Sequence, residues 1–142
     1  MAQKLIYLDA GAFIARHRES DDYHAEAVYG WRQLEHQRIR CITSNLVLVE
    51  AVRYLSRSIG NGAAAERLKI WLSSDWLRVL RPDTEIDLEA IALFEKYADQ
   101  RIGFTDCVSF VLMGRHRIDV VFGFDDHFKW AGFHLWPGKR KQ

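Results

Sequence analysis

Short apolar runs alternate with longer amphipathic segments along the whole chain. The runs have the composition of buried strands and lie at residues 4–8, 40–43, 76–80, 119–124 and 133–137. The segments between them have helical periodicity and lie at residues 23–37, 45–60, 63–74, 84–100 and 104–118. Strands that alternate with helices are joined by crossovers, which bring parallel strands side by side. The sequence therefore predicts an α/β fold, with a mainly parallel central sheet and helices on both faces.

The size and composition of the chain predict one soluble domain spanning residues 1–142. A chain of 142 residues, 49% hydrophobic and 27% charged, builds a single core. Cys41 and Cys107 are far apart and form no CxxC pair, which indicates free thiols in a reducing compartment. Asp9 interrupts the apolar N-terminal segment and no cleavage site follows, so we expect a cytoplasmic protein without a signal peptide or membrane span.

The net charge of +1 gives no global positive field that would attract nucleic acid. Any contact with nucleic acid must therefore be local. The basic residues of the tail, 138–142, are interpreted as a solvated terminus.

Four acidic residues stand at the borders of apolar segments in four separate parts of the chain: Asp9, Glu50, Asp106 and Asp125. Ligands of parallel sheets collect outside the carboxyl ends of the strands. Asp9 and Asp125 each follow a predicted strand, Asp106 lies in the first turn of a predicted helix, and Glu50 lies about two turns into another. We therefore expect three or four of these carboxylates to converge on one pocket.

Clustered carboxylates are stable beside a core only when they meet positive charge. Oxygen ligands suit Mg²⁺ or Mn²⁺, whereas zinc prefers Cys or His. One or two such ions lower the pKa of a bound water and stabilise the charge that develops on a phosphate. The pattern predicts a metal site at Asp9, Glu50, Asp106 and Asp125 that catalyses phosphodiester hydrolysis.

Each acid also has a local interpretation. Asp9 and Asp106 are suitable helix caps, and Glu50 is a candidate for a buried ion pair. Asp125 and Asp126 are adjacent, so at least one of them suits a turn, and either is a candidate for the fourth acid of the cluster.

The chain resembles the PIN-domain ribonucleases and, among them, the VapC-type toxins of toxin–antitoxin pairs. The resemblance covers nearly the whole chain and is carried by the segments YLDAGAFIA, TSNLVLVEAVRYL, FTDCVSFVLMGRHRI and VFGFDDHFKWAGFHLWP. It implies a Mg²⁺- or Mn²⁺-dependent endoribonuclease that is inhibited by a cognate antitoxin and forms homodimers. Asp9, Glu50 and Asp106 match the three metal-binding acids of the family, and Asp125 matches the more variable fourth. Many relatives carry Ser or Thr after the first acid, where this chain has Ala10.

Several residues near these segments are further candidates for the site. His127 is a candidate for a contact at the mouth of the pocket, and Asn45 is a candidate either for a polar group of the site or for a helix cap. Arg16 and Arg18 follow the first strand, and either is a candidate contact for an RNA phosphate.

Three alternatives to a toxin remain open in the sequence. A phospho-acceptor receiver domain is also a small α/β fold that binds Mg²⁺, but the expected acidic pair after the first strand is absent. A PIN-like domain could bind RNA or protein without cleaving it. A PIN nuclease could also act in RNA maturation without an antitoxin.

Overall fold

A computed structural model describes residues 4–138 of the chain. Its centre is a sheet of five strands, in the order β3-β2-β1-β4-β5, and every neighbouring pair is parallel. The strands are β1 (Leu5–Leu8), β2 (Arg40–Ser44), β3 (Leu77–Leu80), β4 (Val120–Phe122) and β5 (His134–Trp136). The prediction of a mainly parallel sheet is confirmed. Residues 139–142 of the basic tail lie outside the described part of the chain.

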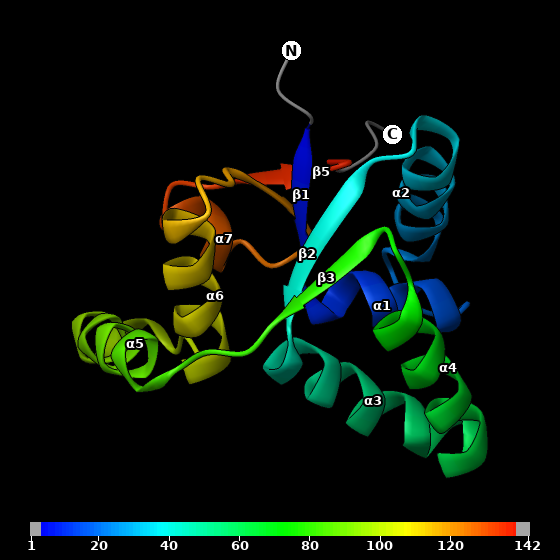
Figure 1. Ribbon diagram of the computed structural model, residues 1–142, viewed down its shortest axis with the longest axis horizontal. Coiled ribbons are helices and arrows are strands. Elements are labelled where there is room, and N and C mark those ends of the chain that lie inside the picture. Colours follow the sequence, from blue (N-terminus) through cyan, green and yellow to red (C-terminus); the bar gives the residue numbers. More distant parts are fainter. Residues whose placement is uncertain (1–3, 139–142) are drawn as a thin grey trace.

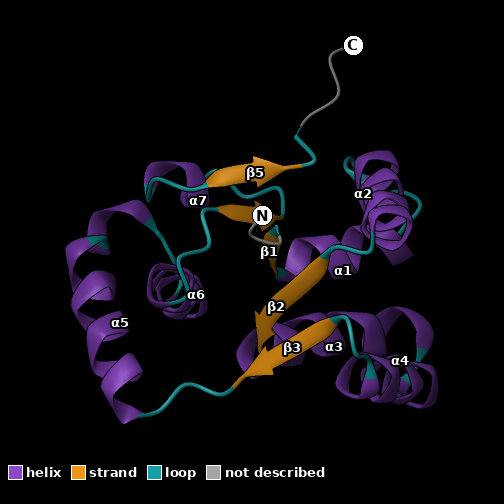
Figure 2. Ribbon diagram, turned by 45° about the horizontal axis from the view of Figure 1, so that its top comes forward, coloured by secondary structure: helices purple, strands orange, loops and turns teal. Residues whose placement is uncertain are grey.

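The helices form two groups, one on each side of the sheet (Figures 1 and 2). One group contains α1 (Ala10–His17), α2 (His24–Gln37), α3 (Asn45–Ile59) and α4 (Asn61–Ser73). The other contains α5 (Thr84–Lys96), α6 (Phe104–Arg115) and α7 (His127–Trp130), with a short 3₁₀ turn at Ala98–Gln100 between α5 and α6. Helices thus cover both faces, as predicted.

Strand β1 lies in the middle of the sheet, and this position explains its continuous apolar sequence. Ile6, Tyr7 and Leu8 are fully buried because helices cover both faces of the strand. The Tyr7 hydroxyl remains satisfied in the core through a 2.8 Å hydrogen bond with the Ser109 hydroxyl of α6. That bond links the central strand to the helix that carries Asp106.

The sheet order also excludes the receiver alternative. Receiver-type α/β domains have the order 2-1-3-4-5, whereas this chain places β4, and not β3, beside β1.

Both cysteines are buried and free, as expected. Within the described residues, no helix combines the length and apolarity needed to span a bilayer.

Two details of the secondary structure differ from the sequence prediction. The helix predicted at 84–100 ends at Lys96 and continues only as the 3₁₀ turn. The segment after β4, predicted as a loop, contains the four-residue helix α7. Asp125 initiates this helix, because its carboxylate accepts a hydrogen bond from the His127 backbone N–H at 2.9 Å.

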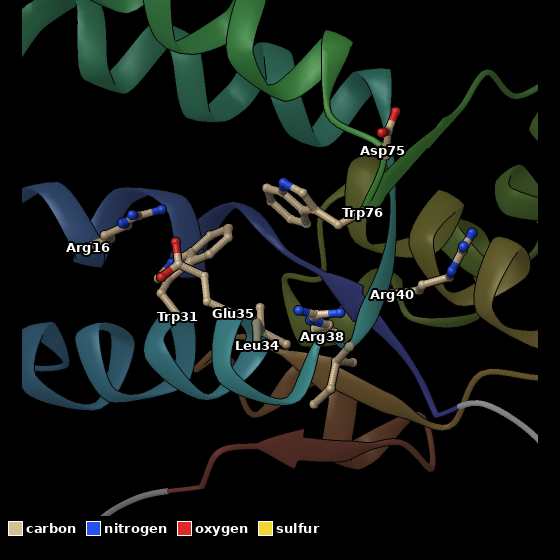
Figure 3. A pocket seen from close by; sticks show the side chains of 9 residues that line it. Arg16, Trp31, Leu34, Glu35, Arg38, Arg40, Asp75 and Trp76 are labelled. Atoms are coloured by element: carbon tan, nitrogen blue, oxygen red, sulfur yellow. The ribbon is translucent and has the colours of Figure 1, made fainter.

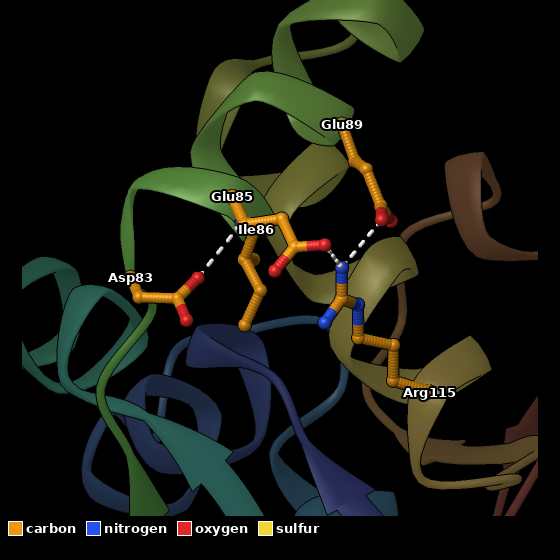
Figure 4. Close-up of polar contacts among 5 residues, drawn as sticks. All are labelled: Asp83, Glu85, Ile86, Glu89 and Arg115. Atoms are coloured by element: carbon orange, nitrogen blue, oxygen red, sulfur yellow. Dashed lines mark hydrogen bonds and ion pairs between the residues drawn. The ribbon is translucent and has the colours of Figure 1, made fainter.

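An ion-pair network fixes α5 against α6 on the outer side of the molecule (Figure 4). Arg115 near the end of α6 pairs with both Glu85 and Glu89 of α5. Asp83 caps α5 by accepting the Ile86 N–H at 2.9 Å. The ion pairs are exposed and contribute little stability, so they orient α5 more than they stabilise it.

Aromatic rings fill the space between the sheet and the first group of helices. Phe13 contacts Trp31 and Trp71, with ring centroids 5.5 and 4.6 Å apart, so both tryptophans belong to the core. The ring of Phe122 lies against α2 at Gly30, where an added Cβ would be 2.6 Å from the Phe122 Cζ atom. Only a glycine allows α2 to pack this close to the sheet.

Gly30→Ala should therefore destabilise the protein by about 1–3 kcal/mol, because overpacking displaces a buried ring. Urea unfolding at constant m-value measures this loss. Gly62→Ala is the matched control, because a Cβ at that helical position meets no atom within 4 Å. Equal stability of the two variants would contradict the tight packing of Gly30.

Candidate active site

Asp9 occupies the carboxyl end of the central strand. Its backbone N–H donates to the Phe122 carbonyl of β4 at 3.0 Å, which continues the ladder between the two strands. The Thr43 hydroxyl of β2 donates to the Leu8 carbonyl at 2.7 Å. Gly123 packs against Asp9 from the other side, with its ideal Cβ position 3.0 Å from the Asp9 Cβ. The backbone at Asp9 is therefore held by both neighbouring strands, and only 7% of the residue's surface is exposed.

Glu50 comes from α3, which starts directly after β2. Ser44 caps this helix by accepting the Val47 N–H at 3.2 Å, and this cap determines where the helix leaves the sheet. Asn45, in the first turn, has a side-chain oxygen that is buried and has no hydrogen-bond partner among the described residues. An unsatisfied buried acceptor is costly, so Asn45 is a polar group available to a ligand at this edge of the sheet.

Asp106 and Asp125 approach from the opposite side and meet at His127. The His127 Nδ1 atom is 3.2 Å from an oxygen of each carboxylate. Together the three residues place one ligand atom each within 4.8 Å of one another. The sequence identified the two acids but assigned His127 only to the pocket mouth. Its central position depends on α7, which the sequence pattern did not predict.

The four acids affect one another electrostatically, so the structure brings all of them into one region. Burial raises the pKa of Asp9 well above its ordinary value, and the charge of Asp106 raises it further. The pKa of Glu50 is raised by desolvation and then by Asp106 and Asp125. The pKa of Asp106 is raised by burial, although the hydrogen bond with His127 opposes this shift. A cation bound among these carboxylates would stabilise their ionised forms, because it would offset both the burial and the mutual repulsion.

Within residues 4–138, no lysine or arginine forms an ion pair with any of these four acids. The interpretation of Glu50 as half of a buried ion pair is therefore wrong. Asp126 differs from its neighbour Asp125, because one of its oxygens lies 3.9 Å from the Lys129 ammonium group. Asp125, and not Asp126, is the residue that faces the cluster.

The donor atoms of this cluster fit a divalent cation. Two carboxylates and an imidazole nitrogen lie close enough together to bind one ion. The Asn45 side-chain oxygen, which has no hydrogen-bond partner among the described residues, lies at the same edge of the sheet as the buried carboxylate of Asp9. Asp9 and Glu50 do not belong to the tightest group, which contains Asp106, Asp125 and His127. They would complete the oxygen-rich environment that Mg²⁺ and Mn²⁺ prefer.

Arg16, one of the two candidate RNA contacts, lies away from these acids. It lines a cavity of about 550 Å³ with Trp31, Arg38, Arg40 and Trp76 (Figure 3). The guanidinium of Arg16 lies over the Trp31 ring, 4.7 Å from its centroid. α1 begins directly after Asp9 and carries Arg16 away from the carboxyl end of the sheet, towards the start of β2.

Comparison with known proteins assigns the family. A sequence profile of the PIN domain matches residues 6–133. The chain belongs to the PIN-domain family. This PIN domain is 28% identical over 129 residues to the "23S rRNA-specific endonuclease VapC20" of Mycobacterium tuberculosis, an alignment that covers 91% of this chain and 95% of that protein.

Solved structures resemble the same PIN domain along most of its length. The crystal structure of M. tuberculosis VapC20, described as a sarcin-ricin loop cleaving toxin, aligns with a TM-score of 0.78 and 27% identity, covering 90% of this chain and 95% of that one. VapBC2 from Rickettsia felis, bound to a promoter DNA fragment, aligns with a TM-score of 0.66 and 16% identity, covering 92% and 96%. The second similarity shows the fold alone.

Proposed function

We propose that this PIN domain is a metal-dependent endoribonuclease and the toxin of a VapC-type toxin–antitoxin pair. The observation that carries the proposal is the group of four carboxylates at one sheet edge, without a lysine or arginine partner among the described residues. Similarity to VapC20 over nearly the whole chain supports the same reaction class.

Asp9, Glu50, Asp106 and Asp125 are the residues proposed to hold Mg²⁺ or Mn²⁺. Such an ion supplies a water of lowered pKa and stabilises charge on the phosphate during hydrolysis. The rigid positions of Asp9 and Asp106 orient the carboxylates before any ligand binds. His127 would join them as a nitrogen donor, because its Nδ1 atom lies 3.2 Å from oxygens of both Asp106 and Asp125.

The proposal is tested by RNA cleavage with purified protein. Ribosomal RNA is the first substrate to test, because the similar VapC20 is named for cleavage of 23S rRNA. Cleavage should require Mg²⁺ or Mn²⁺, stop with EDTA, and be absent from Asp9→Asn prepared in parallel to exclude a contaminating nuclease. Metal-independent cleavage, or equal cleavage by Asp9→Asn, would contradict the proposal.

His127 should also affect the choice of metal. A nitrogen donor favours Mn²⁺ over Mg²⁺, since Mn²⁺ accepts imidazole more readily than the harder ion does. His127→Ala should lower Mn²⁺ affinity by roughly tenfold or more and Mg²⁺ affinity by less, as measured by calorimetric titration. His134→Ala is the control, because His134 is exposed on β5. Unchanged Mn²⁺ affinity in His127→Ala would exclude His127 from the site.

A homodimer and a cognate antitoxin belong to the same proposal. Leu88, Ile91 and Phe94 are 62%, 41% and 44% exposed and follow helical spacing on α5, which supports a second copy of the chain packing on this face. Light scattering should give a dimer for the wild type and a monomer for Leu88→Asp.

A gene for an inhibitory protein beside the gene of this chain would identify the chain as a toxin and would exclude a nuclease of RNA maturation that acts without an antitoxin.

A further inference from the structure

We propose that Trp130 is a stacking platform for an unpaired RNA base next to the cleavage site. This inference rests on the proposed endoribonuclease function and adds a substrate-binding residue outside the carboxylate cluster. Trp130 is 60% exposed, although tryptophan is a large apolar residue that usually lies mostly buried. Exposed aromatic rings beside a nuclease site provide a surface on which bases stack.

The fold anchors the backbone that carries Trp130. Trp130 ends α7, whose Phe128 is fully buried and packs edge-on against Phe110 of α6 with centroids 5.1 Å apart. The Trp130 backbone N–H donates to the Asp126 carbonyl at 3.1 Å. Figures 1 and 2 show α7 beside α6. The backbone that carries the indole is thus anchored, so the ring projects from a defined position at the end of α7.

Two contacts connect Trp130 to the carboxylate cluster. The ring centroids of Trp130 and His127 are 5.2 Å apart. The His127 Nδ1 atom is in turn 3.2 Å from oxygens of Asp106 and Asp125. A phosphate held at these carboxylates through a metal ion would therefore lie close to the indole. A base stacked on Trp130 would belong to a nucleotide at or beside the cleaved bond.

A cavity beside Trp130 offers chemistry suited to a nucleotide. Its volume is about 470 Å³, and it is lined by Tyr97, Asp99, Gln100, Arg101 and Trp130. Arg101 supplies a guanidinium for a phosphate, while Asp99 and Gln100 supply acceptors and a donor for the polar edge of a base. All three are exposed. A guanidinium together with two aromatic rings suits a nucleotide, because its phosphate can contact the first and its base can stack on the second.

Cross-linking tests the position of the base directly. The protein would carry Asp106→Asn to prevent cleavage, and the probe would be single-stranded RNA octamers with one 5-iodouridine at varied positions. Irradiation should give an adduct that peptide mass spectrometry locates at Trp130. Adducts found only at other residues would overturn the proposal.

RNA affinity tests the contribution of stacking. In the same Asp106→Asn protein, Trp130→Ala should weaken octamer binding roughly five- to a hundredfold in fluorescence anisotropy at fixed salt, whereas Trp130→Phe should retain most of the affinity. Leu72→Ala removes an apolar side chain that is 50% exposed on α4 and serves as the matched control. In the otherwise wild-type protein, Trp130→Ala should keep the Mn²⁺ affinity unchanged while cleavage at subsaturating RNA falls.

The outcomes separate this inference from the proposed function. Metal-dependent cleavage that is equal in wild type and Trp130→Ala, with equal octamer affinity, would overturn the role of Trp130 alone. A change in oligomeric state with unchanged RNA affinity would instead make Trp130 a contact between copies of the chain. A wild-type protein that neither binds nor cleaves RNA would overturn both proposals.

Discussion

Asp106→Asn should abolish RNA cleavage while the protein remains folded. Asp106 belongs to the tight group with Asp125 and His127. Its charge also raises the pKa values of Asp9 and Glu50, so it interacts with every other acid of the cluster. Loss of residues that merely orient metal ligands costs 10- to 100-fold, so loss of a proposed ligand should cost at least about a hundredfold in rate. Single-turnover cleavage with saturating Mn²⁺ measures the effect. Cleavage at the wild-type rate would exclude the carboxylate cluster as the active site.

The same variant should be more stable than the wild type when metal is absent, and the gain should depend on pH. The pKa of Asp106 is raised in the folded protein, chiefly by burial, so the folded state loses stability as pH rises from the unfolded pKa through the folded one. Asparagine carries no charge and avoids this loss. The melting temperature should therefore differ little at pH 3.5 and more at pH 8. A lower melting temperature for the variant at pH 8 would indicate a structural role.

Phe122→Ala should have the largest effect on stability, about 3–5 kcal/mol, because it removes a fully buried ring from the core. The ring contacts Trp31 and Trp136, with centroids 5.5 and 5.2 Å apart, and it is also the surface against which Gly30 packs. A loss of this size is a large share of the stability of a small domain.

Chemical unfolding at 25 °C measures the loss, with Leu72→Ala as the control. Leu72 is 50% exposed on α4, away from the proposed dimer face, so its truncation should change the free energy of unfolding by less than about 0.5 kcal/mol. A loss of stability below about 1 kcal/mol would show that the ring is not part of a close-packed core.

The sequence predicted the sheet, the helices and the four acids because each depends on a local pattern. Apolar runs indicated the strands, and helical periodicity indicated α2 to α6. Asp9 and Asp125 could be placed at strand ends because residues after parallel strands share one edge of the sheet. These predictions needed no knowledge of which side chains meet.

The remaining features depend on contacts between distant segments. His127 belongs to the carboxylate group only because α7 turns its ring back towards α6, and a four-residue helix leaves no periodic signal. Arg16 is only seven residues from Asp9 in the sequence, but the two residues lie at opposite ends of α1. The distinction between Asp125 and Asp126 likewise required the position of His127, which contacts Asp125. A pattern within one segment could not predict these contacts, because each of them joins residues from different segments.

The carboxylate cluster is divided between the two helical groups that cover the sheet. Asp9 and Glu50 come from the first part of the chain, whereas Asp106 and Asp125 come from the last part, on the strand and helices that close the other side. A ribosome must therefore release the chain as far as Asp125 before the four carboxylates can meet. The order of synthesis itself keeps a nascent chain without a complete site until β4 has joined β1.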